Sequence, residues 1–281
     1  MLTQKAYFES VAYGAAIQNI NTEILRNTKI SLPPMGEQKR IANVLKSYDD
    51  LIENNRRRMA LLENSARLLY REWFVHLRFP GHATARVSDS IPEGWRKVGL
   101  GAICEAVRES VSPDEVEPDT PYIGLEHMPR RSISLGEWDT AEKVTSNKFR
   151  YREGDILFGK IRPYFHKVGI AFTDGIASSD AIVIRAREEK HAALLLMTVS
   201  SDPFVADAAQ SMREGSKMPR ADWKQMTCYP VLLPPDGLLQ QFSETIRATT
   251  DQLKTLTFQT QKLKTARDLL LPKLMSGEIE V

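Results

Sequence analysis

A run of basic residues mixed with aromatic residues is the part of this sequence best suited to chemistry with a polyanion. Residues 143–167 hold seven cations against two carboxylates, a net charge of +5 that exceeds the +2 of the whole chain. The cations are Lys143, Lys148, Arg150, Arg152, Lys160, Arg162 and Lys167, and the interleaved aromatic residues are Phe149, Tyr151, Tyr164 and Phe165. Cations neutralise phosphates and aromatic rings contact bases, so the segment favours nucleic-acid binding. A solvated face backed by core aromatic residues is the alternative.

Two smaller basic groups could extend such a surface. Arg213, Lys217 and Arg220 lie in a glycine-containing loop, and Arg130-Arg131 form a separate pair.

Patterns typical of enzymes are missing from the sequence. The segment around Gly99 and Gly101 lacks the third glycine of a dinucleotide or methyl-donor loop, and no GxxxxGK[ST] loop occurs. The five histidines show no HExxH or other paired metal spacing. Glu153 and Asp155 lie near Lys160 without the further spaced carboxylate of a nuclease metal site. The sequence therefore predicts neither catalysis nor a metal site.

Length and composition are those of a globular protein. The 281 residues are 42% hydrophobic and 26% charged, enough for a real core in one large domain or two ordinary ones. Cys104 and Cys228 form no ligand set, and we expect reduced thiols. The N-terminus lacks a signal-peptide layout, and no apolar run has the length of a membrane span. We therefore expect a cytoplasmic protein without membrane contact.

The elements that must position the basic run are short and mixed. Gly, Pro, Asp and Ser separate strand candidates at residues 122–125, 155–158, 168–172, 181–184 and 226–233. Helices are expected at residues 188–199 and 203–212. The fold class predicted for residues 95–235 is therefore one compact α+β domain.

An apolar seam with coiled-coil spacing precedes this domain and returns after it. In the first copy it runs over residues 41–73, and in the second over residues 242–274, with each position shifted by 201. At about 1.5 Å per residue the first seam spans about 50 Å, which suits a spacer helix. We expect the two helices to pair through Ile41, Leu45, Ile52, Asn55, Leu62, Leu69, Leu253, Leu256, Leu263 and Leu270.

The repeat is wider than the helices. With the same shift, Pro33-Pro34 match Pro234-Pro235, and an expected strand at residues 28–32 matches the last strand of the domain. The repeated unit is a globular domain followed by a helix, so the chain contains one unit and a fraction of another.

Two polar features within the first helix have open interpretations. Asn55 at a core position either fixes the register of the pair or is a tolerated local defect. Arg56-Arg57-Arg58 either reach a phosphate backbone or keep the helix in solution.

Several motifs together cover nearly the whole chain. They are LPPMGEQKRIANVL followed by LIENNRRRMALLENSARLLYREWFVHLRF, then IPEGWRKVGLGAIC, REGDILFGKIRPYFHKVGIAF and the terminal LLLPKLMSGEIEV. In this order they resemble the specificity (S) subunits of type I restriction-modification systems.

This resemblance implies a fold and a division of labour. S subunits carry target recognition domains that each read half of a split DNA site, joined by two conserved helices that pack as an antiparallel coiled coil. They lack catalytic activity and any cofactor of their own. They dock methyltransferase (M) subunits, which use S-adenosylmethionine, and the assembly recruits restriction (R) subunits, which depend on ATP and Mg. Duplex DNA contacts are then expected from Lys148, Arg150, Arg152, Lys160, Arg162, Tyr164, Lys167 and Lys217.

The resemblance also implies domain boundaries. Residues 1–35 would be the tail of a first recognition domain, 36–76 the central spacer helix, 77–94 a connector, 95–235 the recognition domain and 236–281 the distal spacer helix with its tail. Because most of a first recognition domain is lacking, we expect either a homodimer with C2 symmetry or pairing with an upstream S fragment. A helical scaffold that binds protein and not DNA, or an inactive truncated gene product, is the alternative function.

Overall fold

The structure, a computed structural model, describes residues 5–12, 21–29, 33–210 and 219–280, and the chain divides into two compact units. The smaller unit comprises Met1–Arg56 and Gln259–Val281, and the larger comprises Arg57–Phe258. Two long helices, α3 (Met35–Tyr70) and α7 (Asp236–Ser276), contribute residues to both units.

The smaller unit contains two short helices, α1 (Lys5–Val11) and α2 (Thr22–Asn27), with the first part of α3 and the last part of α7. Arg267 and Asp49 form an ion pair of 2.6 Å that joins the two long helices here. α7 ends before Gly277, which takes a left-handed conformation with φ +75° and lets the next amide donate to the Lys273 carbonyl. A left-handed glycine of this kind is a common helix stop because it lacks a Cβ atom.

The strand expected at residues 28–32 is not found where the structure describes it. Thr28 is the C-cap of α2, and Lys29 lies in irregular backbone. The other three positions of that predicted strand lie outside the described residues. The side chain of Thr28 donates to the Ile24 carbonyl, so it is used to end a helix.

Two five-stranded sheets pack face to face in the larger unit. The first sheet has the order β4-β13-β10-β11-β7 and the second β5-β9-β12-β6-β8, with parallel pairing at β11–β7 and β12–β6 and antiparallel pairing elsewhere. The strands of the first sheet are β4 (Cys104–Val107), β7 (Ser134–Leu135), β10 (Ile156–Gly159), β11 (Val168–Ala171) and β13 (Ala181–Ala186). Those of the second are β5 (Ser110–Val111), β6 (Pro121–Ile123), β8 (Asp139–Thr140), β9 (Lys148–Tyr151) and β12 (Gly175–Ala177).

Strand β10 is buried on both of its faces. Ile156 and Phe158 point into a core shared with helices α4 (Ala192–Val199) and α5 (Asp202–Gln210), whereas Leu157 points into a second core between the two sheets. Successive side chains of a strand point to opposite faces, so the continuous apolar run Ile156–Phe158 fits a strand with cover on both sides. β10 is thus the central strand of the domain.

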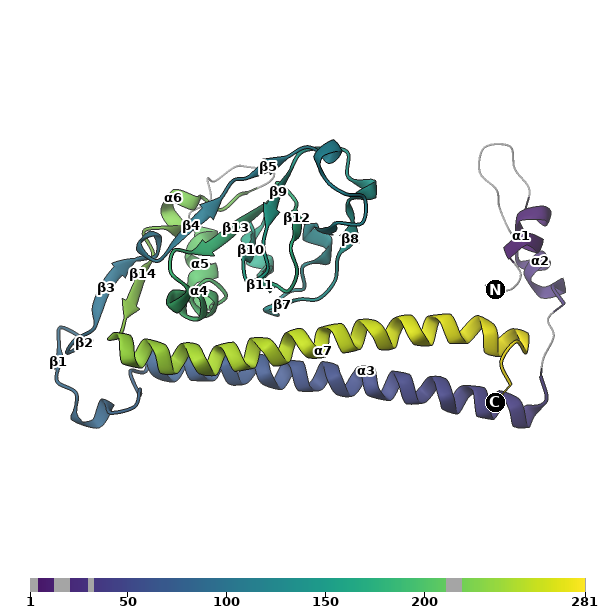
Figure 1. Cartoon of the computed structure of the whole chain (residues 1–281), viewed down its shortest axis with the longest axis horizontal. Coiled ribbons are helices and arrows are strands. Elements are labelled where there is room, and N and C mark those ends of the chain that lie inside the picture. The colour runs from purple at the N-terminus through teal and green to yellow at the C-terminus, as the bar shows by residue number, and fades with distance from the viewer. Residues whose placement is uncertain (1–4, 13–20, 30–32, 211–218, 281) are drawn as a thin grey trace. The chain divides into compact units, whose positions relative to one another are not determined.

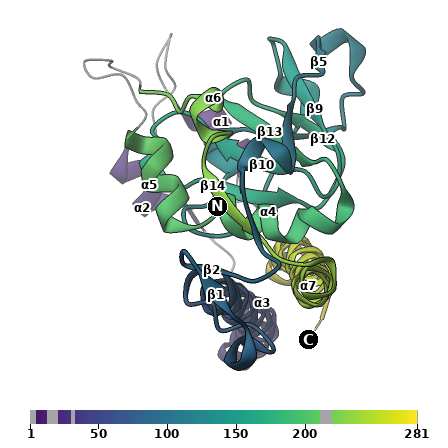
Figure 2. The same ribbon diagram turned by 90° about the vertical axis from the view of Figure 1, so that its left-hand side faces the viewer.

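Short elements connect this domain to the long helices. β3 (Arg96–Gly99) pairs with β14 (Pro230–Leu233), which runs into the start of α7. The hairpin of β1 (Val87–Ser88) and β2 (Ile91–Pro92) precedes β3, and α6 (Trp223–Met226) precedes β14. In Figures 1 and 2 α4 lies beside the first part of α7, and the Ser243 hydroxyl donates to the Lys190 carbonyl there at 2.9 Å.

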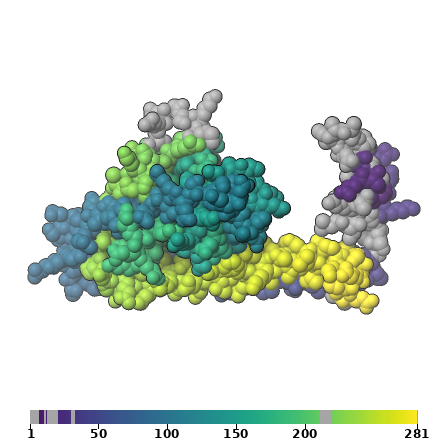
Figure 3. All heavy atoms as spheres, turned by 45° about the horizontal axis from the view of Figure 1, so that its top comes forward, coloured from purple at the N-terminus to yellow at the C-terminus, as the bar shows by residue number. Residues whose placement is uncertain are grey.

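The two long helices pack antiparallel, as predicted. α3 continues into a π-helical turn at Arg71–Val75, where the Phe74 ring lies 4.8 Å from that of Phe242. The Arg267–Asp49 pair lies 25 residues before Phe74 on α3 and 25 residues after Phe242 on α7, which is the relation that antiparallel helices require. The α+β class is likewise confirmed: Figure 3 shows the two-sheet domain lying along the first part of α7, where the Trp138 and Phe258 rings meet.

The start of each helix also follows the repeat. α3 begins at Met35 and α7 at Asp236, 201 residues later, each directly after a double proline.

Of the elements expected in the domain, each strand candidate has a counterpart, from β6 to β14, and α4 and α5 match the two expected helices. The connector, expected to be irregular, contains the β1–β2 hairpin, which is too short to leave a periodic pattern.

Among the described helices none is by itself long and apolar enough to cross a membrane; Glu189–Val199 and Asp202–Gln210, bent by 70°, reach the required length and hydropathy when taken as a pair.

Candidate nucleic-acid interface

Strand β10 divides the basic run of the sequence into two groups. Arg152 lies just before β10 and Lys160 just after it, so the two side chains lie at opposite ends of the strand. β11 is antiparallel to β10, with Phe158 opposite Val168, and this returns Lys167 to the Lys160 end. A strand of four residues separates its ends by about 13 Å, more than a Debye length at physiological salt. The two groups therefore belong to different surfaces.

The Lys160 end is joined to a segment far along the chain. The Lys160 amide donates to the Asp180 carbonyl at 2.9 Å, and the Ala221 amide donates to the Lys160 carbonyl at 2.8 Å. Ile161 forms an isolated antiparallel bridge with Arg220. These backbone contacts place the exposed Arg220 guanidinium beside Lys160.

A groove of about 890 Å³ opens at this end, and Phe149 and Trp223 are among the residues that line it. Four cations from three separate segments lie along it, and the described lining residues include one carboxylate, that of Asp222. The cations are Arg108, Lys160, Arg220 and Lys224. Aromatic walls with an excess of cations suit a nucleic-acid backbone and the bases beside it.

Lys160 is the most enclosed of these cations. Its ammonium donates to the Ser179 carbonyl, which holds the side chain in place. Burial lowers the pKa of Lys160, Asp180 opposes this, and the nearby Arg220 and Arg108 lower it further. Like charges gathered at one place repel each other, so an approaching phosphate would relieve that repulsion.

A turn with two left-handed residues projects from the same end. Arg162 has φ +48° and His166 φ +54°, and between them Pro163–Phe165 form one turn of 3-10 helix. The Arg162 amide donates to the Pro219 carbonyl at 3.0 Å. Tyr164 at the tip is 53% exposed. We call residues 162–166 the reading turn.

The Arg152 end is electrostatically mixed. A hollow of about 510 Å³ there includes Arg150, Arg152 and Arg185, but four carboxylates line it as well: Glu109, Glu117, Asp119 and Asp174. Arg150 donates to the Glu115 carbonyl at 3.0 Å, and its Nε atom lies 3.6 Å from Glu109. Arg185 makes two hydrogen bonds of 2.7 and 2.6 Å to the buried Asp155. Most of the positive charge at this end is balanced within the protein.

Two other predicted contacts, Lys148 and Lys167, are not among the residues that line the groove. Lys148 is 9% exposed, and its ammonium donates to the carbonyl and hydroxyl oxygens of Ser146 at 2.9 and 2.7 Å. The Lys167 ammonium donates to the Leu125 carbonyl. Lys217 lies outside the described residues. The structure therefore gives no open cation at Lys148, whose expected DNA contact conflicts with its burial.

Sequence reasoning did not single out three residues that line the groove. Trp223 and Lys224 lie just after the loose basic set that ends at Arg220, and Arg108 lies more than 100 residues before them. Arg220 was expected only as part of a loose set. A local charge count could not find them because strand pairing brings them together across about 110 residues.

A metal site is not found in the described part of the chain. No group of three or more His, Cys, Asp or Glu side chains lies close enough there to hold an ion.

Known proteins similar to this chain are specificity subunits of type I restriction enzymes. Residues 1–64 match the family model of the type I restriction modification DNA specificity domain. Over 99% of its length the chain is 24% identical to the type I restriction enzyme MjaIX specificity subunit of Methanocaldococcus jannaschii, covering 67% of that protein. It is also 24% identical over 79% of its length to the EcoDI specificity subunit of Escherichia coli, covering 55% of it.

The chain is similar to the specificity (S) subunits of type I restriction-modification systems. A solved S subunit from M. genitalium has the same fold, with a TM-score of 0.52 at 16% identity, over 97% of this chain and 70% of the other. The chain spans about two thirds of one curated relative and about half of another.

The residues expected to pair the two long helices are buried to different degrees. Ile41, Ile52, Asn55, Leu253 and Leu256 are buried, with exposed fractions of 7% or less. The other five are partly buried: Leu45, Leu62, Leu69, Leu263 and Leu270.

Proposed function

We propose that this chain is the DNA-recognition subunit of a type I restriction-modification complex and reads duplex DNA with the groove and the reading turn at the Lys160 end of β10. The observation that carries the proposal is the convergence of Arg108, Lys160, Arg220 and Lys224 on one groove beside the exposed Tyr164. The fold shared with a solved S subunit, and the names of the curated relatives, support it.

The arrangement suits a division between positioning and reading. Lysine and arginine side chains along the groove would contact phosphates and set the register of the DNA. Arg162 and Tyr164 project on the reading turn and would reach base edges, where a guanidinium can pair with guanine and a ring can contact a thymine methyl group.

The test is salt-dependent binding by the S subunit assembled with its M subunits. A Lys160→Ala, Arg220→Ala double variant should weaken affinity for all duplexes, because each lost phosphate contact lowers the slope of log K against log salt by about one. The matched control is the Arg150→Ala, Arg152→Ala double variant, which also removes two cations from the same protein.

The opposite pattern of salt slopes would contradict the proposal. An unchanged slope in the Lys160, Arg220 variant together with a reduced slope in the Arg150, Arg152 variant would mean that DNA binds at the Arg152 end of β10. Failure of the wild-type complex to bind any duplex at low salt would favour the alternative of a helical scaffold that does not bind DNA.

The long helices would serve as spacer and as platform for the M subunits, over residues 37–74 and 237–276. Leu61 and Leu68 on α3 and Val75 at the end of the π-helical turn recur every seven residues and are 67%, 49% and 56% exposed. An exposed apolar stripe with this spacing fits a partner helix. A Leu61→Ser, Leu68→Ser variant should lose M-subunit capture in a pull-down, whereas Val87→Ser, at an exposed valine of β1, should retain it.

The domain boundaries given above, with the recognition domain at residues 95–235, complete the proposal. One such domain would read one half-site, and the other half-site would fall to a second copy of this chain or to another S fragment. Native mass spectrometry of the DNA-bound complex distinguishes these. Methylation with S-adenosylmethionine and ATP- and Mg-dependent restriction would be carried out by the M and R subunits, in the cytoplasm where the DNA lies.

A further inference from the structure

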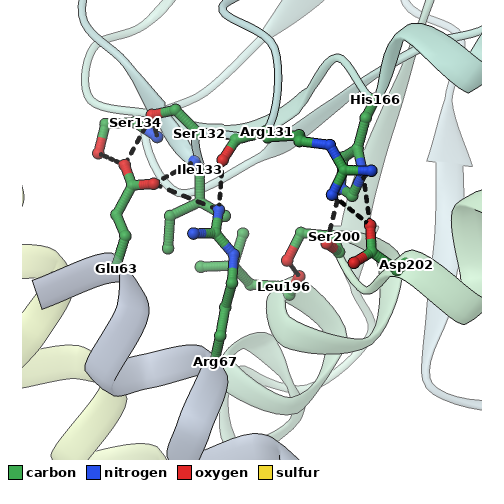
Figure 4. A network of polar contacts seen from close by, with 10 residues as sticks. All are labelled: Glu63, Arg67, Arg131, Ser132, Ile133, Ser134, His166, Leu196, Ser200 and Asp202. Carbon is green, nitrogen blue, oxygen red and sulfur yellow. Dashed lines mark hydrogen bonds and ion pairs between the residues drawn. The ribbon is translucent and has the colours of Figure 1, made fainter. Parts of the chain in front are cut away.

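A buried carboxylate on α3 holds a loop of the recognition domain. Glu63 is 5% exposed and accepts hydrogen bonds from both hydroxyls of the Ser-Ile-Ser segment that leads into β7: 2.7 Å from Ser132 and 2.8 Å from Ser134. The Ile133 amide adds a third at 3.2 Å, and Arg67 one turn along α3 a fourth at 3.3 Å. Figure 4 shows Glu63 pointing from the helix into this loop. A buried charge with four donors is well compensated, and it fixes the position of the loop relative to the helix.

The same loop is bound tightly to the strand that follows the reading turn. The Ile170 amide of β11 donates to the Ile133 carbonyl at 2.8 Å. A Cβ atom at Gly169 would lie 2.8 Å from that carbonyl oxygen, so the close approach needs glycine. Glu63 is therefore connected through one loop to the start of β11.

A second branch runs from α3 to the reading turn itself. Arg67 donates to the Arg131 carbonyl at 2.7 Å, and the Arg131 guanidinium donates to Asp202 at 2.8 Å. His166, the last residue of the reading turn, places Nδ1 3.2 Å from the same carboxylate. Figure 4 shows these side chains in one continuous chain of contacts.

Both the ring and the main chain of His166 make hydrogen bonds. It is 6% exposed, its Nε2 atom lies 2.9 Å from the Ser200 carbonyl, and its own carbonyl accepts from the Arg131 amide at 2.9 Å. Because the Ser200 carbonyl can only accept, Nε2 carries a proton. The left-handed backbone of His166, uncommon for a residue with a side chain, is thus maintained by contacts on both its ring and its main chain.

We propose that Glu63 and the Arg67–Arg131–Asp202–His166 chain are positioning residues that fix the orientation of the reading turn relative to α3. The inference rests on the proposed function, since it assigns these residues a role in reading DNA without contact to it. A turn that must present side chains to particular base pairs loses discrimination when its orientation varies, whereas phosphate attraction tolerates such variation.

If these residues position the reading turn, their loss should affect binding to specific DNA and to scrambled DNA differently. Removing Glu63 or breaking the chain of contacts to His166 should reduce the ratio of affinities for specific and scrambled DNA. The affinity for scrambled DNA should stay nearly the same. A merely structural role would instead change both affinities with the fraction of folded protein.

The experiment uses the complete complex of S and M subunits. The wild type first selects from a library of random duplexes with variable central spacing, and the consensus and a scrambled duplex then serve as probes. Glu63→Gln should reduce consensus-over-scrambled discrimination about tenfold or more, with less than about a twofold change on the scrambled duplex. Hydrogen exchange at the Arg131 and Ile170 amides should become faster.

Asp202→Ala is the second variant, because it removes the 67% exposed carboxylate that Arg131 and His166 both contact and leaves the buried Glu63 cluster intact. Asp50→Asn, at an exposed position of α3, is the control and should behave as wild type. Unchanged discrimination and exchange in the folded Asp202→Ala complex overturns the inference alone. Failure of the wild type to select any consensus overturns the proposed function and the inference with it.

Discussion

The two ends of β10 carry similar numbers of cations but use them differently. At the Arg152 end, Arg185 is paired with the buried Asp155, Arg150 lies beside Glu109, and Lys254 of α7 is paired with Glu153. At the Lys160 end, most cations lie along an open groove, and one weak pair of 3.5 Å joins Arg220 to Asp180. The charge at the first end holds the domain together, whereas that at the second remains available to a ligand.

This difference shows why charge density along a sequence is an incomplete guide to a binding surface. A cation contributes to the outside field of a protein only if nearby carboxylates do not cancel it. The same four residues of β10 that bury apolar side chains on both faces also keep the two groups of cations apart. Four predictions test whether the two ends of β10 differ in this way.

The largest expected effect is on stability at the Arg152 end. Asp155 is 3% exposed and accepts two bonds from Arg185 and one of 2.7 Å from the Arg152 amide. Asp155→Ala should lower the free energy of unfolding by about 3–5 kcal/mol, because it leaves the Arg185 charge without its partner. Urea unfolding measures this. If the folded variant instead lost DNA affinity at unchanged stability, the Arg152 end would be a binding surface.

The next effect concerns DNA discrimination at the Lys160 end. Tyr164→Ala should reduce the preference for the selected site by about 1–3 kcal/mol at one base-pair position, the usual contribution of a base contact. Stability should change little, because the ring is 53% exposed. Tyr164→Phe, which keeps the ring, is the control. Equal loss on all sequences would mean that Tyr164 contacts the backbone of the DNA.

A smaller effect should follow from pH. Burial lowers the pKa of His166 below its ordinary value of 6.5, and the Ser200 carbonyl and the exposed Asp202 oppose this only in part, while Arg131 and Arg67 lower it further. Below pH 6.5 the unfolded chain therefore binds more protons than the folded one. Stability should be full above pH 6.5 and fall as the pH drops, by at most about 1.4 kcal/mol per pH unit for one group.

Urea unfolding of wild type and His166→Gln at pH 7.5 and 5.5 checks this expectation. The variant should lose part of the dependence, while His191, whose pKa burial also lowers, retains the remainder. A wild-type stability that increased towards pH 5.5 would contradict it.

The smallest effect is expected at Lys148. Because the side chain is 9% exposed and its ammonium is bound to Ser146, Lys148→Met should change DNA affinity by less than about twofold. A binding titration against the Lys160→Ala variant gives the comparison. A loss as large as that of Lys160→Ala would show that Lys148 leaves Ser146 and joins the interface.

Local signals in the sequence were sufficient for the long helices. The seam of α3 and α7 depends on spacing within one helix, and the double prolines before Met35 and Asp236 mark their starts. The strand at residues 155–158 was also predictable, since its apolar run and flanking Gly154 and Gly159 are local features. The hairpin β1–β2 was not, because two-residue strands leave no pattern.

The proposed interface could be predicted in part. Arg162 and Tyr164 lie on the reading turn and Lys160 lies two residues before it, and the three were found together because they are neighbours in the sequence. Glu63 was not singled out, since on α3 it looks like any solvated glutamate until the Ser132–Ser134 loop covers it.

By itself, the sequence determined the α+β class, the repeated pair of long helices and the resemblance to S subunits, because these depend on periodicity and on motifs within short stretches. The tertiary structure alone decided which cations share a surface. Arg108, Lys160 and Arg220 meet because β10 ends where the segment before α6 pairs with it, and Arg150 and Arg152 are excluded because they lie at the other end of the strand. Strand pairing is a long-range interaction, so the spacing of charges along the chain cannot reveal it.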